Sequence, residues 1–407
     1  MAASGPAERA GDTSRPIFAW LCIVIAVLEG FDLQVAGVVA PRVAASMHLG
    51  ADALGLFFSA STFGLLFGAL AGGWAADRLG RIPVLAGSVF AFGVASVLNG
   101  LASTGPELIL ARFATGLGLG GALPNLIALT SENARPGRQK RAVAYLYCGV
   151  PIGGMLVSLA GAFFGDAWRL LFFAGGIVPV AVGIALWALG KRGTSGVIAR
   201  PVQEIGAIAA LFHERRAVPT ILVWTSFCAT LIVLYLVLNW LPLLLSGMGF
   251  SAKQALFAQL AFNGGGFLAC LLTAPLLDSP RAWIIALGAF LAVPILLYAM
   301  SLVAVPVTGI ALALLLGGAI LTTQSFLYAM APTIYPVGTG GTGTGAAVAW
   351  GRIGSIAGPL YGTALLSGNA AERDVLAGLV PIALVAGVSA VALALRLRGQ
   401  LDQVATL

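Results

Sequence analysis

The chain alternates long apolar runs with short polar segments. The first run, IFAWLCIVIAVLEGFDLQVAGVVA (residues 17–40), is interrupted only by Glu29 and Asp32. Because a bilayer core about 30 Å thick needs roughly 20 apolar residues per helix, each such run predicts one membrane-spanning helix. The pattern predicts twelve spans, at residues 17–40, 53–75, 82–103, 107–131, 141–164, 169–190, 218–246, 252–277, 282–303, 307–331, 341–366 and 375–396. We therefore expect an all-α polytopic membrane protein.

The polar segments divide these spans into two halves. They predict a disordered cytoplasmic amino terminus at 1–16, a first six-helix half at 17–190, a cytoplasmic linker at 191–217, a second six-helix half at 218–396 and a cytoplasmic tail at 397–407. The loop GGWAADRLGR after the second run and the loop APLLDSPR after the eighth form a weak repeat, half a chain apart. Parallel repeats that bind substrate between them near the membrane midplane are typical of transporters. The first run is too long for the h-region of a signal peptide, so we expect it to remain as the first span.

Composition and charge agree with a membrane protein. Of the 407 residues, 59% are hydrophobic and 9% are charged, whereas soluble domains are about 25% charged. The net charge of +7 would indicate nucleic-acid binding only on a soluble basic face. Here 16 of the 22 Lys and Arg residues lie in the termini and in the loops on the same side, and Arg112 and Arg352 lie within spans. Four lie in loops on the opposite side: Arg42, Arg169, Lys253 and Arg373. Basic loops stay in the cytoplasm, so both termini are predicted to be cytoplasmic.

The sequence gives no sign of metal or catalytic chemistry. The four cysteines lie far apart in apolar runs without CxxC spacing, which is typical of small buried side chains. His48 and His213 lie near the ends of predicted spans, and no nucleophile–base cluster is present. We therefore expect no enzyme activity, no cofactor and no metal site.

One glycine pattern has two interpretations. GLGLGG (116–121) matches the dinucleotide fingerprint GxGxxG, which requires a preceding strand and a following acidic residue at a ribose. The pattern lies inside an apolar span instead. Close packing of helices through small residues is therefore the favoured interpretation.

Two acidic residues within the first span point to function. A charge at the bilayer centre costs about 2.5–3.5 kcal/mol on insertion scales, and Glu29 and Asp32 share one helix face. Arg112 is five residues into a span that descends from the outside, about 8 Å deep, and Asp32 is about 12 Å deep. We expect Arg112 and Asp32 to meet. A purely structural ion pair is the alternative to a functional one.

Arg352 is the second cation within a span. It lies eleven residues into the eleventh span, about 17 Å from the inner face, and no carboxylate of its own half lies at that depth. An anionic substrate would supply the partner, since a planar guanidinium suits a carboxylate in bidentate geometry. We assign the substrate site to Arg112, Arg352, Phe31, Tyr235, Trp240 and Tyr328. The aromatic residues could instead be packing or interface residues.

The acidic pair suggests how transport is driven. Burial disfavours the charged form of a carboxyl group, and a neighbouring carboxylate disfavours it further. Glu29 and Asp32 would then form a coupled pair, in which one site exchanges a proton while Arg112 holds the other ionised. Asp32 is the favoured proton site because its charge state affects Arg112.

Several motifs together resemble the major facilitator superfamily. GWAADRLGR (73–81) is similar to its signature loop after the second span, and RFATGLGLGGALPN (112–125) to its fourth-span motif. Within the superfamily, LEGFDLQVAG (28–37) resembles the first span of the aromatic acid:proton symporters, and looks most like the 3-(3-hydroxyphenyl)propionate transporter branch. Three further segments fit that family: NWLPLLL (239–245), APTIYP (331–336) and GRIGSIAGP (351–359). The resemblance covers the whole chain and implies the major facilitator fold.

The resemblance also implies a gate at the inner side. Asp77 would cap the positive amino end of the eleventh helix when the cytoplasmic side is closed. Arg78, Arg81 and Glu132 would belong to the same charge cluster. The alternatives are that Asp77 is a solvated loop charge paired with Arg78 or Arg81, and that Glu132 is an interfacial carboxylate without a special role.

Two departures from the family pattern affect this gate. The family often has Arg where Gly340 stands, and the loop Asp278–Arg281 is a degenerate copy of Asp77–Arg81. The motif CGVPIGG (148–154) concerns the direction of transport and not the gate. It departs from the Gly-Pro-x-x-Gly-Gly pattern of drug:proton antiporters, and this departure favours import.

We therefore expect a proton-coupled importer of an aromatic carboxylate, of the hydroxyphenylpropionate or hydroxybenzoate type, in a bacterial inner membrane. Its partners would be a small organic anion, protons and the lipid bilayer rather than nucleic acid, and it would act as a monomer. The alternatives are a symporter of another organic anion, such as a sugar acid or dicarboxylate, and an exporter. A non-transporting membrane sensor is less favoured.

Overall fold

The computed structural model describes residues 14–134, 139–164, 167–190, 212, 216–276, 282–335 and 340–405. All regular structure within these ranges is helical. The first half contains α1 (Ser14–Met47), α2 (Ala51–Leu79), α3 (Arg81–Leu101), α4 (Gly105–Asn133), α5 (Gln139–Tyr147), α6 (Gly149–Phe163) and α7 (Trp168–Gly190). The second half contains α9 (Ala217–Gly247), α10 (Ala252–Thr273), α11 (Ala282–Ser301), α12 (Pro306–Met330), the 3₁₀ turn η1 (Ala331–Ile334), α13 (Gly340–Ser367) and α14 (Glu372–Ala405).

These helices form the twelve predicted spans, with α5 and α6 together making the fifth. Eleven spans are long and apolar enough to cross a membrane. The twelfth is α13, a helix of 28 residues whose first turns are rich in glycine and threonine and whose middle carries Arg352. The prediction of an all-α protein with twelve spans is confirmed.

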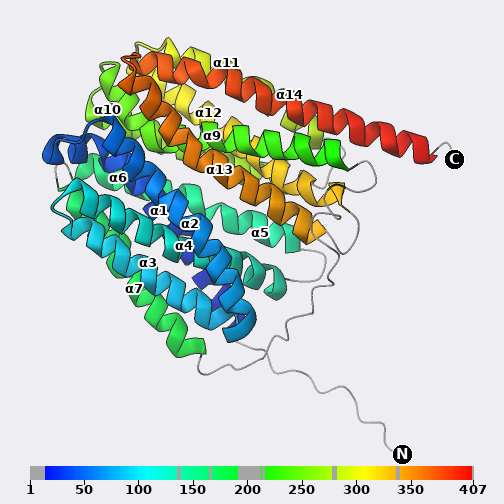
Figure 1. Cartoon of the computed structure of the whole chain (residues 1–407), viewed down its shortest axis with the longest axis horizontal. Helices are drawn as coiled ribbons and strands as arrows, with labels where there is room; N and C mark the ends of the chain where they lie inside the picture. Colours follow the sequence, from blue (N-terminus) through cyan, green and yellow to red (C-terminus); the bar gives the residue numbers. More distant parts are fainter. Residues whose placement is uncertain are drawn as a thin grey trace, which may run out of the picture.

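The two halves repeat the same pattern of helix pairing. In the first half α2 packs on α4, α3 on α7 and α1 on α6. The corresponding pairs in the second half are α10 on α12, α11 on α14 and α9 on α13. Figure 1 shows the first half, in blue to green, below the second half, in green to red. The halves meet where α10 contacts α6 and where α13 contacts α2.

The fifth span differs from the single helix that was predicted. It breaks at Cys148, between α5 and α6. Pro151 lies in the first turn of α6, where its missing N–H removes one helical hydrogen bond and its ring crowds the carbonyl four residues earlier, at Tyr147. The backbone N–H of Cys148 donates instead to Tyr145 O, at 3.2 Å.

The glycine-rich segment of α4 is a packing surface. A Cβ atom at Gly116 would collide with the backbone of Ser61 in α2, and one at Gly120 would collide with the backbone of Leu65. The two helices approach this closely because glycine has no side chain at the contact. The packing interpretation of GLGLGG is therefore confirmed, and the helical setting excludes the strand that a dinucleotide site requires.

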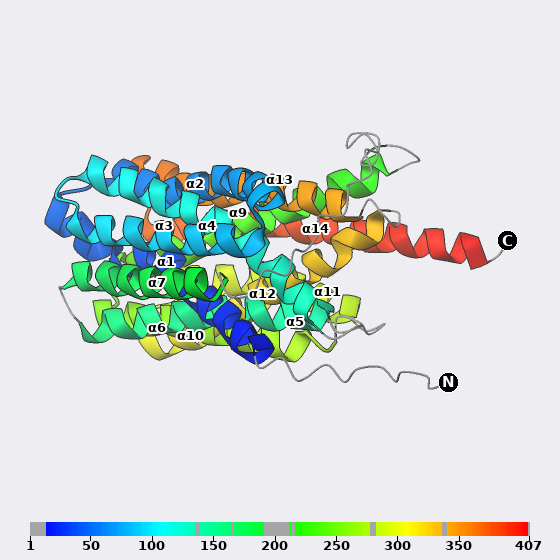
Figure 2. The same ribbon diagram turned by 90° about the horizontal axis from the view of Figure 1, so that it is seen from below.

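The bundle has two ends, which Figure 2 shows from a second side. We call the end with the α1–α2 turn (48–50) and the α13–α14 turn (368–371) the distal end, and the end with Ser14 and Ala405 the proximal end. The halves are joined at the distal end. Ser367 Oγ donates to Asp52 Oδ1 at 2.6 Å, and Ser59 Oγ donates to Ile356 O at 3.1 Å.

Some predicted segments lie outside the described residues, including residues 1–13, almost all of the linker, and Asp278 and Arg281. Two helices are longer than expected. Helix α1 continues past residue 40 to Met47, and α14 continues through most of the predicted tail to Ala405.

Candidate functional site

The two acidic residues of α1 lie in the interior of the bundle. The side chain of Glu29 is 3% exposed and that of Asp32 is fully buried. Gly30 between them faces the backbone of Val150 in α6, where a Cβ atom would collide. This close approach fixes the rotation of α1, so that the two carboxyl groups have different surroundings.

Asp32 is anchored within the first half. Its Oδ2 accepts a hydrogen bond from Arg112 Nη1 at 3.1 Å, and its Oδ1 accepts one from Ser96 Oγ at 2.8 Å. Arg112 Nη1 also donates to the backbone carbonyl of Asp32 at 3.2 Å. The expected contact between Arg112 and Asp32, which rested on their similar depths in the membrane, is therefore present. The contact of Ser96 with Asp32 was not predicted.

Arg112 is held almost entirely by its own half. Its side chain is 1% exposed, and its guanidinium lies 5.8 Å from the centre of the Phe57 ring. Among the described residues, Arg112 Nε is a buried donor without a partner. One N–H group therefore remains available, although the charge is already balanced by Asp32.

Arg352 of α13 faces the interface between the halves. It is partly exposed, and its Nη1 donates to the hydroxyl of Tyr235 in α9 at 2.8 Å. Its charge interacts with that of Glu29 across the interface. The sequence placed no carboxylate beside Arg352 because the acidic residue comes from the other half.

Glu29 and Asp32 therefore differ in their partners. Glu29 Oε2 is buried and has no hydrogen-bond partner among the described residues. The electrostatic partner of Glu29 is Arg352, whereas that of Asp32 is Arg112. The charged neighbour of Asp32 thus belongs to its own half and that of Glu29 to the other half. The coupling expected within the acidic pair stays a prediction.

The charge of Arg352 interacts with three tyrosines, Tyr147, Tyr235 and Tyr328. Tyr328 of α12 lies across the interface from Tyr147 of α5, with 5.7 Å between ring centres, and Phe227 of α9 lies 5.2 Å from Tyr328. Tyr147 and Tyr328 are half-buried. Tyr147 was missed by the sequence analysis, although its place beside the helix break at Cys148 could have singled it out.

Two predicted aromatic residues lie elsewhere. The ring of Phe31 packs beside Gly175 of α7, inside the first half. Trp240 is fully buried, donates from Nε1 to Pro359 O at 3.2 Å and packs against Phe58 with 4.9 Å between ring centres. The structure therefore places neither of them beside Arg352, and Trp240 belongs to the packing between the halves.

The predicted gating residues lie at the proximal end. Arg81 and Glu132 form an ion pair, and the Arg78 guanidinium lies 3.8 Å from the centre of the Trp74 ring. Asp77 is exposed, and no described residue bonds to it. The structure thus brings two of the four together, Arg81 and Glu132, and the capping of α13 by Asp77 stays a prediction.

Three amides between the halves were also missed. Gln34 of α1 bonds to Gln259 and Asn263 of α10. The spacing of Gln259 and Asn263, four residues apart within an apolar run, is the signal that could have found them.

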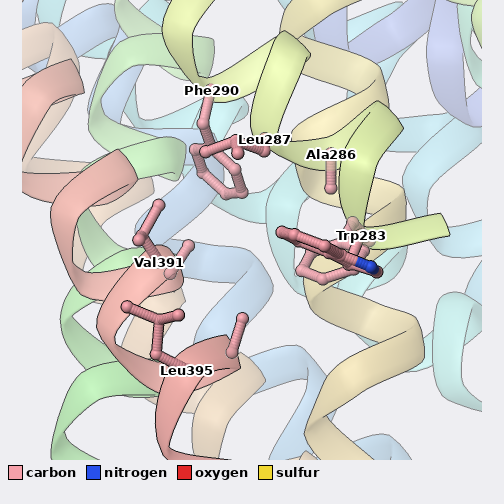
Figure 3. A pocket seen from close by; sticks show the side chains of 9 residues that line it. Trp283, Ala286, Leu287, Phe290, Val391 and Leu395 are labelled. Atoms are coloured by element: carbon pink, nitrogen blue, oxygen red, sulfur yellow. The ribbon is translucent and has the colours of Figure 1, made fainter. Parts of the chain in front are cut away.

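The apolar pocket in Figure 3 is separate from this site. It lies between α11 and α14, with Trp283, Phe290 and Leu395 among its lining residues. None of the lining residues is ionisable, so it does not suit an organic anion. Within the described ranges, no three His, Cys, Asp or Glu residues cluster as metal ligands would.

Comparison with known proteins agrees with the fold and with the motifs. Residues 22–359 match the family model of the Major Facilitator Superfamily. The chain is 40% identical over 373 residues to the 3-(3-hydroxy-phenyl)propionate transporter of Escherichia coli (strain K12), covering 91% of each chain. It is 30% identical to the 4-hydroxybenzoate transporter PcaK of Pseudomonas putida, covering 89% of each.

A solved structure shows the same fold. The crystal structure of a D-xylose-proton symporter matches with a TM-score of 0.74 at 19% identity, covering 91% of this chain and 96% of that one. The resemblance drawn from the signature loop, the fourth-span glycines and the first-span acidic motif is confirmed. The chain belongs to the Major Facilitator Superfamily, a family of membrane transporters rather than enzymes.

Proposed function

We propose that this protein imports an aromatic carboxylate together with protons, by alternating access, across a bacterial inner membrane. Two relatives that align along most of the chain are named for 3-(3-hydroxy-phenyl)propionate and 4-hydroxybenzoate. Both compounds are aromatic acids, which supports the same class of substrate here.

The observation that carries the proposal is the position of Arg352 at the interface, where it bonds to Tyr235 and its charge acts on Glu29 of the other half. Arg352 is a partly exposed cation held by one neutral hydroxyl, at 2.8 Å, so it retains N–H groups for a ligand. A guanidinium binds a carboxylate through two parallel hydrogen bonds. Tyr147, Tyr328 and Phe227 supply aromatic surface close by, on which an aromatic ring can pack.

The same charge interaction suggests how a proton is coupled to the substrate. In the empty site Arg352 is the charged group that favours the ionised form of Glu29, against the burial that disfavours it. A substrate carboxylate that binds Arg352 replaces Glu29 as its partner, which leaves a buried carboxylate without a counter-charge. A buried charge of this kind is neutralised by taking up a proton. One substrate anion would then move with one proton.

Asp32 and Arg112 have a different part in this proposal. Asp32 accepts hydrogen bonds from both Arg112 and Ser96, and both favour its ionised form. The pair would keep α1 fixed to α3 and α4 while Glu29 changes its charge. This proposal differs from the sequence-based preference for Asp32 as the proton site. It is supported by the two hydrogen bonds that Asp32 accepts, whereas Glu29 Oε2 has no partner among the described residues.

The distal closure supports alternating access. Two hydrogen bonds between the halves, from Ser367 Oγ to Asp52 Oδ1 and from Ser59 Oγ to Ile356 O, hold the distal ends together. An external substrate can enter only after these ends separate. The excess of basic residues at the proximal end predicts that this end is cytoplasmic and that the distal end faces outward.

The test is uptake into proteoliposomes that contain the purified protein. Labelled 3-(3-hydroxyphenyl)propionate, benzoate and protocatechuate would be supplied with and without an inward proton gradient. We expect accumulation of at least one acid only with the gradient. Accumulation of a sugar acid or dicarboxylate alone would identify another symporter. Binding without movement of label across the membrane would identify a sensor.

A further inference from the structure

A cluster of three amide side chains connects the two halves between the candidate site and the distal end. Gln34 Nε2 donates to Asn263 Oδ1 at 2.9 Å, and Asn263 Nδ2 donates back to Gln34 Oε1 at 2.7 Å. Gln259 Nε2 donates to the same Gln34 oxygen at 3.2 Å and to Leu238 O at 3.3 Å. All three side chains are buried.

One acceptor in this cluster has no donor. Gln259 is fully buried, and no described residue donates to its Oε1 atom. Turning the amide over would not help, because the oxygen of Gln259 would then face the oxygen atoms of Gln34 and Leu238, which need a donor. A buried acceptor without a donor is costly. The donor that Gln259 Oε1 lacks would be a hydroxyl or an N–H group.

The surrounding helices make room for the cluster. Gly154 of α6 lies against it, and a Cβ atom at this position would collide with both the Gln34 amide and the Asn263 carbonyl. The three amides therefore meet at a position where the opposing helix has no side chain.

The cluster lies a short distance from Arg352 along the membrane normal. Tyr235, which bonds to Arg352, and Leu238, which bonds to Gln259, are three residues apart on α9, which corresponds to about 4.5 Å. Glu29 and Gln34 are five residues apart on α1, or about 7.5 Å. An aromatic ring with a short acidic side chain has a length of this order.

We propose that Gln259, oriented by Gln34 and Asn263, accepts a hydrogen bond from a ring hydroxyl group of the substrate whose carboxylate is held by Arg352. This deepens the proposed function and rests on it, since it assumes an aromatic acid at the central site. The cluster contains residues from both halves, so the hydroxyl site is complete only when the distal ends are closed. A site built to bind a hydroxyl group discriminates against the analogue that lacks it.

The test compares two acids that differ by one hydroxyl group. Dissociation constants for 3-(3-hydroxyphenyl)propionate and 3-phenylpropionate would be measured by calorimetry with the full-length protein in detergent. We expect the wild-type protein to bind the hydroxylated acid about tenfold more tightly, as one hydrogen bond to a buried acceptor provides. Gln259→Met, which keeps the side-chain length without the acceptor, should reduce the ratio to about twofold or less.

Three variants serve as controls. Gln259→Leu repeats the removal with another shape, in case the methionine variant does not fold. Gln259→Glu keeps an acceptor but loses the N–H donor to Gln34 Oε1 and Leu238 O, so it should keep more of the preference than Gln259→Met and less than the wild-type protein. Asn125→Leu removes a buried amide of α4 that bonds to Gly121 O within its own helix, and should leave the ratio unchanged.

The outcomes separate this inference from the proposed function. Suppose that the wild-type protein binds both acids and that Gln259→Met leaves the ratio of their dissociation constants unchanged, even if it weakens the binding of both. The hydroxyl site is then wrong and the proposed function stands. If the wild-type protein binds neither acid, the proposed function is wrong and the hydroxyl site falls with it.

Discussion

Glu29 and Asp32 lie one helical turn apart on α1, yet their charged partners come from different halves of the protein. Asp32 accepts a hydrogen bond of 3.1 Å from Arg112 of its own half, whereas the cation whose charge acts on Glu29 is Arg352 of the other half. Motion of one half against the other would therefore leave the first pair intact and change the second. A conformational switch requires an interaction that differs between two conformations of the protein, and the interaction between Glu29 and Arg352 can differ in this way.

The first prediction concerns the buried pair of Arg112 and Asp32. Replacing one partner leaves an unpaired buried charge, which costs about 3–5 kcal/mol, whereas replacing both removes the charge altogether. We expect Arg112→Met to lower the stability of the detergent-solubilised protein strongly, and Arg112→Met with Asp32→Asn to recover most of the loss. Thermal unfolding followed by circular dichroism would measure both.

A matched control for this pair is Arg373→Met, because Arg373 is exposed in the first turn of α14. We expect its unfolding temperature to match that of the wild-type protein. Equal unfolding temperatures for Arg112→Met and Arg373→Met would show that the buried pair contributes nothing to stability.

The second prediction concerns the substrate carboxylate. Arg352→Ala should weaken binding of the acid by about 100-fold, since a charge-assisted bidentate contact is worth up to about 3 kcal/mol. Arg352→Lys should restore it in part, because an ammonium group keeps the charge but not the planar geometry. Calorimetry with the acid and with its neutral amide analogue would separate the effects. An equal loss for both ligands would refute the carboxylate contact.

The third prediction concerns orientation in the membrane. A single cysteine at Asn369, in the α13–α14 turn, should react with an impermeant maleimide added outside cells, and one at Ser195 should react only after the membrane is opened. The protein used must lack Cys22, Cys148, Cys228 and Cys270. The reverse labelling pattern would show that the protein has the opposite orientation in the membrane. The closed distal end would then face the cytoplasm.

Much of this architecture could be predicted because it depends on local patterns. The length of each apolar run fixed the twelve spans, and depth along two antiparallel helices was enough to place Arg112 near Asp32. The break at Cys148 was missed because Pro151 was interpreted as part of one continuous run. Its effect depends on its place in the first turn of α6.

The relations between the halves could not be predicted in the same way. The charge of Glu29 interacts with that of Arg352, the ring of Tyr147 lies beside that of Tyr328, and Gln34 bonds to Asn263. Each pair joins residues that are far apart in the chain, and hydrophobic periodicity fixes the face of a helix but not the partner of that face. Trp240 was assigned to the substrate for the same reason, since its contact with Phe58 comes from the other half.

The last prediction concerns proton coupling at Glu29. Glu29→Gln keeps the shape of the protonated acid and fixes it neutral, so it imitates the state in which substrate holds Arg352. We expect this variant to lose accumulation driven by a proton gradient, because no proton can be released on the cytoplasmic side. It should still exchange labelled for unlabelled substrate, because exchange need not release a proton.

Asp32→Asn provides the comparison, since it alters the other carboxylate of the same helix face. We expect it to reduce accumulation and exchange together, because it weakens the contact that fixes α1 to α4 through Arg112. Paired uptake and counterflow in proteoliposomes would measure both variants, with the amount of folded protein determined by gel filtration. If Glu29→Gln accumulates substrate normally while Asp32→Asn retains exchange alone, the proton site is Asp32. The separation of the two carboxylates into an anchor and an exchanging group would then be wrong.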